Sequence, residues 1–166
     1  AAYLDNAGLD YQRLDNLEGL DNAEGLLVIG HDTLTAGESI GRSILEFANR
    51  GGRVVVLEQE NVPAGANLPV TIETTTHMGG YAHPKALGTP VFRDLEQWDL
   101  TDWAGDHPTF KNVYNKPTEG ARILAEAGAL LPYSPMIELP TGHGVIVLCQ
   151  LRVGDKLGQD PAADVL

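Results

Sequence analysis

The chain has 166 residues, of which 43% are hydrophobic and 20% are charged, and its formal net charge is −12 at pH 7. This length favours one domain with a core of its own. The negative charge argues against nucleic acids and anionic membranes as partners, because both are polyanions. No apolar run approaches the length of a membrane span.

The first third of the chain predicts strands alternating with a helix. Residues 11–14 read as a short strand, and residues 26–30 form a continuous apolar run that is typical of a strand buried on both faces. Residues 35–50 carry apolar side chains at helical spacing, and residues 54–57 form a second apolar run. This order predicts a parallel sheet covered by helices.

The rest of the chain is less regular. Residues 70–76 are rich in β-branched side chains and predict a strand, whereas residues 77–117 show little periodicity and predict an irregular, functional segment. Residues 121–127 are compatible with a helix or a strand. We favour a strand, because residues 134–139 and 144–151 then follow as a hairpin.

Both ends of the chain look incomplete for a doubly wound domain. Residues 2–9 read as the end of a short helix, and no strand precedes that helix. At the other end Asp160 and Pro161 form a helix N-cap and first helical position, but the helix stops within two turns. We therefore predict one α/β domain over residues 1–166 that is a piece of a longer protein.

Polar side chains follow three of the predicted strands. His31 and Asp32 follow the first apolar run, and Glu58, Gln59 and Glu60 follow the second. Gln150 and Arg152 lie at the end of the last. If these strands are parallel neighbours, the side chains converge at one edge of the sheet, where carboxylates and a histidine could perform acid–base chemistry. The alternative is a hydrogen-bonded or solvated edge without a reaction, since polar residues are expected at strand ends.

The irregular segment holds most of the aromatic residues that could touch a ligand or a partner. We predict such contacts for Gln59, Tyr81, Trp98, Trp103, His107 and Arg152. The spacing of His77, His83 and His107 matches no zinc template, so neither a metal nor a cofactor is expected. Cys149 lies within an apolar run and is interpreted as an inert core thiol.

The order strand, helix, Gly51-Gly52-Arg53-Val54-Val55-Val56-Leu57-Glu58 resembles class I glutamine amidotransferase-like domains. This resemblance implies a three-layer flavodoxin-like α/β fold, an open and mostly parallel sheet with an antiparallel edge hairpin. Active members carry a nucleophilic cysteine at the end of this strand, and a histidine and a glutamate after a late strand. Here Glu58 stands at the nucleophile's place, and Gln150-Leu151-Arg152 offers no histidine. The resemblance therefore argues against covalent amide hydrolysis.

A narrower resemblance covers most of the chain. The stretches 25–30, 51–59, 102–107, 134–140 and 144–151 are similar to accessory domains of bacterial glycoside hydrolases of the β-galactosidase-like and family 2-like kinds. This resemblance implies a non-catalytic domain of a carbohydrate-metabolising hydrolase. Its partners would be the catalytic domain of the same parent chain, a saccharide at the rim of the site, or a second copy in a homo-oligomer. A secreted or periplasmic location would follow from the parent enzyme.

Two other functions stay open at this point. One is a small hydrolase that uses Glu58 with His31 or Asp32 in the crevice at the strand ends. The other is a stand-alone module that binds a ligand in the same crevice. No pair of carboxylates can be assigned as a glycosidase acid and nucleophile, because that pairing depends on their separation in space.

Overall fold

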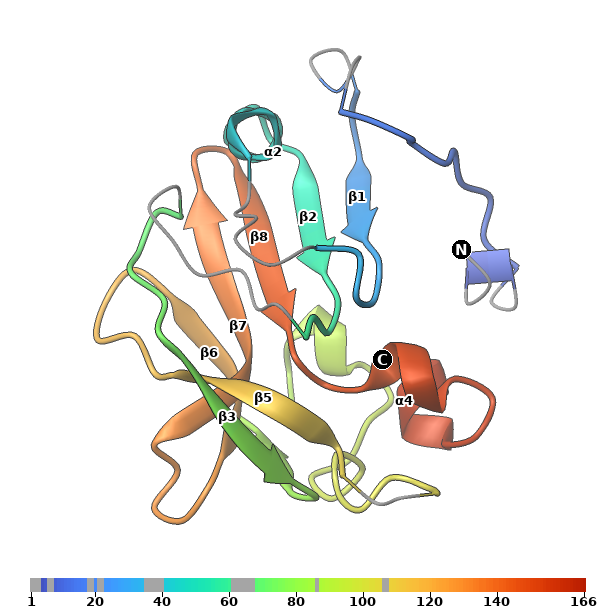
Figure 1. Ribbon diagram of the computed structural model, residues 1–166, viewed down its shortest axis with the longest axis vertical. Helices are drawn as coiled ribbons and strands as arrows, with labels where there is room; N and C mark the ends of the chain where they lie inside the picture. The colour runs from blue at the N-terminus through green and yellow to red at the C-terminus, as the bar shows by residue number, and fades with distance from the viewer. Residues whose placement is uncertain are drawn as a thin grey trace.

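The computed structural model describes residues 4–5, 8–17, 20, 23–34, 41–60, 68–85, 87–105 and 108–166. In this part of the chain, eight strands form one mixed sheet (Figure 1). The strands are β1 (Leu26–Ile29), β2 (Arg53–Val56), β3 (Thr74–Gly79), β4 (Ala82–Pro84), β5 (Phe110–Asn115), β6 (Arg122–Ala127), β7 (Tyr133–Thr141) and β8 (Gly144–Cys149). The helical elements are α2 (Arg42–Asn49), the 3-10 turn η2 (Pro90–Phe92), α3 (Val153–Lys156) and α4 (Pro161–Val165).

The sheet is parallel at one side and antiparallel elsewhere. Its main path runs β1-β2-β8-β7-β5-β3, and β6 pairs with β7 and with β4. β2 pairs in parallel with β1 and β8. The remaining ladders are all antiparallel: β3–β5, β4–β6, β5–β7, β6–β7 and β7–β8.

The predicted three-layer, mostly parallel flavodoxin-like sheet is therefore wrong. A parallel pair needs a long crossover, usually a helix, and α2 supplies one between β1 and β2. From β6 to β8 the strands follow one another through short turns, which permit only antiparallel pairing. The described helices are too few and too short to cover both faces of a parallel sheet.

Several individual elements nonetheless match the prediction. β1, β2, β6 and the β7–β8 hairpin lie where strands were expected. Asp160 caps α4 as predicted, because its side chain accepts a hydrogen bond from the Ala162 backbone N–H at 3.0 Å. The strand expected at 70–76 is shifted to β3, residues 11–14 form no strand, and the segment 77–117 contains β4 and β5.

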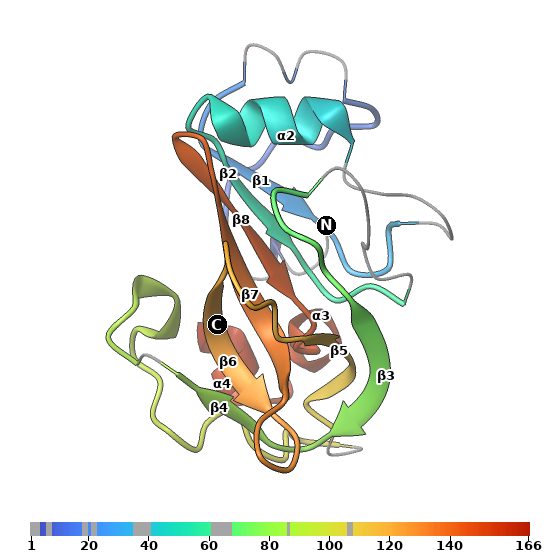
Figure 2. The same ribbon diagram turned by 90° about the vertical axis from the view of Figure 1, so that its left-hand side faces the viewer.

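Two groups of buried side chains pack on the strands. In one, Ile44 and Phe47 of α2 pack with Val54 and Val56 of β2 and with inward-facing residues of β7 and β8. The other gathers aromatic side chains from η2 and β5 with residues of α4. α2 lies at one end of the sheet, and α3 and α4 lie toward the other end (Figure 2). None of the helices in the described residues has the length and apolar character needed to cross a membrane.

Candidate functional site

The carboxyl ends of β1, β2 and β8 meet at one edge of the sheet. Ile29 of β1 aligns with Val56 of β2, and Val56 aligns with Leu148 of β8. The chain after each strand therefore emerges at the same place. These three exits carry His31, Glu58 and, in α3, Asp155.

Three carboxylates surround one nitrogen of His31. Its Nε2 lies 3.2 Å from Oδ2 of Asp32, 3.2 Å from Oε2 of Glu58 and 3.6 Å from Oδ1 of Asp155. A ring nitrogen carries at most one proton, so it can donate to only one of these oxygens at a time. The site is half open, because the side chains of His31 and Asp155 are 27% and 29% exposed.

Glu58 is the buried member of this cluster. Only 3% of the residue is exposed. Burial raises the pKa of Glu58 to about 7, an effect that the nearby His31 opposes and Asp155 reinforces. Within the described residues its Oε2 atom has no hydrogen-bond partner, although it faces His31.

Asp155 is oriented by Arg152. The guanidinium donates to Oδ2 of Asp155 from Nε at 3.2 Å and from Nη2 at 2.8 Å, and it also donates to the Pro108 carbonyl. Burial alone would raise the pKa of Asp155. The hydrogen bond from Arg152 and the positive charges of His31, Arg152 and Lys111 outweigh burial, so the pKa of Asp155 is lowered. With Oδ2 held in this way, Oδ1 is directed toward His31.

Gln59 and Gly154 hold the surrounding backbone in place. The Gln59 side chain is buried, donates to the carbonyls of Gly30 at 2.6 Å and Leu57 at 2.7 Å, and accepts from the Leu34 N–H at 2.9 Å. It therefore joins the segments that follow β1 and β2. A Cβ at Gly154 would lie 3.1 Å from the Cβ of His31, so the glycine allows α3 to approach the cluster closely.

The other predicted contact residues lie in different environments. Tyr81 and Trp98 are 56% and 66% exposed, and Trp98 packs edge-on against His83. Trp103 is fully buried in the core, where its indole N–H donates to the Asp99 carbonyl. His107 lies outside the described residues.

His31, Asp32, Glu58 and Arg152 were predicted from the sequence, whereas Asp155 was not. The sequence contains a pattern that indicates Asp155: an arginine and an aspartate three residues apart lie on one face of a helical turn, as Arg152 and Asp155 do. Asp155 lies one helical turn beyond the residues that directly follow β8, which are the ones expected at the carboxyl end of that strand.

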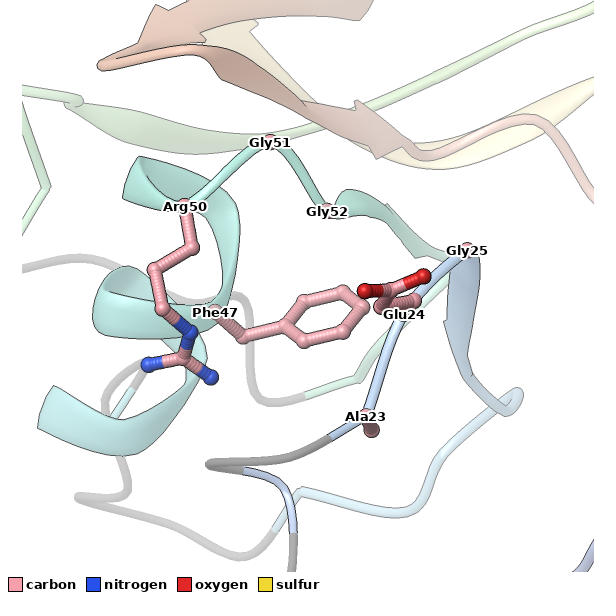
Figure 3. A pocket seen from close by; sticks show the side chains of 7 residues that line it. All are labelled: Ala23, Glu24, Gly25, Phe47, Arg50, Gly51 and Gly52. Atoms are coloured by element: carbon pink, nitrogen blue, oxygen red, sulfur yellow. The ribbon is translucent and has the colours of Figure 1, made fainter.

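A separate hollow lies at the opposite ends of β1 and β2. It is lined by Ala23, Glu24, Gly25, Phe47, Arg50, Gly51 and Gly52 (Figure 3). These residues precede β1 and β2 or lie in and after α2, so the hollow faces the amino ends of the strands. It contains none of the predicted site residues.

The chemistry available at the strand-end cluster is narrow. Cys149 is buried, and burial raises the pKa of its thiol to about 12, so it supplies no thiolate at neutral pH. The remaining groups are an imidazole and carboxylates. Such a set can exchange protons or bind a cation.

Comparisons with known proteins show a fold but no family. No family model and no curated protein sequence matches the chain. A cytoplasmic protein from Salmonella typhimurium LT2 has a similar structure, with a TM-score of 0.60 and 12% identity over 99% of this chain and 81% of that chain. The cold-adapted β-galactosidase from Rahnella sp. R3 matches with a TM-score of 0.54 and 15% identity, over 90% of this chain and 23% of its own.

An exo-β-1,4-mannosidase from Opitutaceae bacterium strain TAV5 also matches. Its TM-score is 0.50 and its identity 14%, over 98% of this chain and 28% of that chain. The chain thus spans less than a third of either glycoside hydrolase. At these identities the likeness is one of fold alone.

Proposed function

We propose that this chain is a non-catalytic accessory domain of a longer bacterial glycoside hydrolase. The observation that carries the proposal is that nearly the whole fold recurs as a minor part of two enzymes that act on glycosides. In such an arrangement the domain contacts the catalytic domain of its own chain. The sugar specificity then belongs to the catalytic domain.

The residues at the edge where the carboxyl ends of β1, β2 and β8 meet support a role without covalent catalysis. The position after β2 carries Glu58, and the thiol of Cys149 is buried and protonated. Covalent amide hydrolysis needs an activated nucleophile with a base beside it. Neither Glu58 nor the protonated thiol of Cys149 is an activated nucleophile like the cysteine of a cysteine–histidine pair.

Trp98 and Tyr81 are the residues that we assign to contacts with the catalytic domain or with a saccharide. Both rings are more than half exposed. Large exposed aromatic side chains are enriched at interfaces and stack on sugar rings. Trp98 is additionally held in place by its edge contact with His83, at a ring-centroid distance of 6.0 Å.

The open reading frame that contains this chain provides the first test. We expect it to continue into a domain that hydrolyses aryl glycosides, whereas this chain expressed without that domain hydrolyses none. A reading frame that encodes this chain alone would overturn the proposal. Binding to a saccharide panel, compared between the wild type and Trp98→Ala, then separates a sugar contact from a protein contact.

A stand-alone ligand-binding module is the second candidate. It is favoured by one observation, since the similar Salmonella protein is matched over 81% of its chain and so is little longer than this fold. A short reading frame together with ligand binding at the strand-end edge would support it. The small-hydrolase alternative would be favoured if Glu58→Gln abolished a hydrolysis measured for the wild type.

A further inference from the structure

We propose that His31, Glu58 and Asp155 form a binding site for a divalent cation of the Zn²⁺ class. The three residues come from the segments after β1 and β2 and from α3. Each offers one donor atom, and these atoms all lie within 4.8 Å of one another. The inference does not depend on whether the chain belongs to a glycoside hydrolase.

The distances around His31 resemble those between ligands of one metal ion. Zinc binds imidazole nitrogen and carboxylate oxygen at about 2.0–2.1 Å, which places neighbouring atoms of a tetrahedral site about 3.3 Å apart. Nε2 of His31 lies 3.2 Å from Oε2 of Glu58 and 3.6 Å from Oδ1 of Asp155. Small side-chain rotations would therefore complete the site. Asp32 lies 3.2 Å from Nε2 of His31 but is not part of the group whose donor atoms all lie within 4.8 Å of one another, so the fourth position is left to water.

Glu58 provides a second, independent observation. The residue is 3% exposed, and its Oε2 atom is buried and has no hydrogen-bond partner within the described residues. Buried polar atoms in folded proteins are nearly always satisfied, and an exception calls for an explanation such as an ion. This oxygen faces the same point as the His31 nitrogen, so a cation there would satisfy both atoms.

Acidic side chains outnumber basic ones around the cluster, although two basic side chains partly offset their charge. Three carboxylates lie around a single imidazole, and two cationic side chains, Arg152 and Lys111, lie against Asp155. Arg152 occupies only Oδ2 of Asp155 and leaves Oδ1 toward the cluster. This is the arrangement in which an outer residue orients a metal ligand. The partial exposure of His31 and Asp155 gives an ion a path of entry.

The donor set selects the kind of cation. Calcium takes six to eight oxygen ligands and magnesium prefers an octahedral oxygen shell, whereas one imidazole with two carboxylates suits Zn²⁺. Bound zinc would tie the exits of β1 and β2 to α3. The sequence gives no zinc template because the three ligands are far apart along the chain and meet only through the parallel pairing of β1, β2 and β8.

The test is zinc titration of the protein encoded by the full reading frame, prepared without a histidine tag and freed of metal with EDTA. We expect calorimetry at pH 7.5 to include a binding event of one Zn²⁺ that depends on these residues. His31→Gln and Asp155→Asn should each weaken that event at least tenfold. His143→Gln is the matched control, because His143 is exposed in the β7–β8 turn at the other end of β8.

Cobalt absorption and circular dichroism complement the zinc titration. Co²⁺ in place of Zn²⁺ should give visible absorption bands in the wild type and in His143→Gln, and these bands should be lost in His31→Gln. Circular dichroism of His31→Gln and Asp155→Asn checks that each variant is folded. Absence of such a binding event, or its survival in His31→Gln, would overturn the proposal.

Discussion

Glu58 is a carboxylic acid held where its charge is disfavoured. Burial raises its pKa from about 4.5 to about 7, so between these values the folded state keeps a proton that the unfolded state has lost. The free energy of unfolding therefore falls as pH rises from about 4.5 to about 7, and it stays at the lower value above pH 7. This loss of stability is the expected cost of a buried group kept for binding.

Glu58→Gln should remove this pH dependence. The amide cannot ionise, so at pH 8 in the presence of EDTA we expect the variant to be more stable than the wild type by on the order of 1 kcal/mol. Urea unfolding at pH 5 and pH 8 measures the difference. Glu60→Gln, at an exposed neighbouring position, is the control. A stability difference that is the same at both pH values would contradict the assignment.

Cys149 should behave as a core residue without reactivity. It is 2% exposed, and burial raises the pKa of its thiol to about 12. A thiol reagent such as Ellman's reagent should therefore modify the native protein at pH 8 at least tenfold more slowly than the urea-unfolded protein. Equal rates in the two states would mean that the thiol is accessible and that a thiolate role has to be reconsidered.

At the level of elements, the parallel side of the sheet depends on close backbone approach at Gly144. A Cβ at this position would clash with the carbonyl oxygens of Gly52 and Ala48. Gly52 lies in the α2–β2 connection and Ala48 in α2, and these backbone atoms cannot rotate away. The glycine therefore allows β8 to pair next to β2 beneath the end of α2.

Gly144→Ala should accordingly destabilise the protein by about 1–3 kcal/mol, the usual range for overpacking. Gly88→Ala is the matched control, because a Cβ at Gly88 would meet no atom within 4 Å. We expect that variant to stay within about 0.5 kcal/mol of the wild type. Chemical denaturation of both variants measures the effect, and equal stabilities would show that the β2–β8 contact relaxes easily.

The elements that could be predicted from sequence are those with strong local signals. The apolar runs of β1, β2 and β8 and the cap at Asp160 were recognised because continuous apolar runs and N-capping leave a local pattern. The predicted burial of β1 on both faces was wrong, because β1 is an edge strand and none of its residues is buried. β5 mixes buried and exposed residues without strict alternation, and β4 has only three residues, so neither was found. The pairing of β4 and β5 depends on contacts distant in sequence. Because these two antiparallel strands were not predicted, the fold class was predicted as mostly parallel.

The candidate site followed from the same local signals. His31 and Glu58 were expected to converge because polar residues after parallel strands share an edge. The exposure of Trp98 and the burial of Trp103 could not be predicted, although the two lie in the same irregular segment. Which of two nearby aromatic residues enters the core depends on the path of the whole segment across the sheet.

At the level of the whole molecule, the two cores are joined through β7 and β8. Successive side chains of a strand point to opposite faces. Ile137 of β7 and Leu148 of β8 belong to the core under α2, whereas Met136 and Cys149 belong to the core that contains Trp103. Each strand is therefore shared, and neither core can unfold without removing support from the other.

Unfolding should consequently be a single cooperative transition. In a Trp98→Phe background, Trp103 fluorescence reports the second core alone, while far-ultraviolet circular dichroism reports the whole sheet. Ile44→Ala, a truncation in the α2 core, should lower the free energy of unfolding by about 2–4 kcal/mol and shift both transitions together. If the circular dichroism transition moved while the Trp103 transition stayed in place, the two cores would be independent units. Coincident shifts would show that β7 and β8 couple the parallel side, which carries the His31–Glu58–Asp155 cluster, to the antiparallel remainder of the sheet.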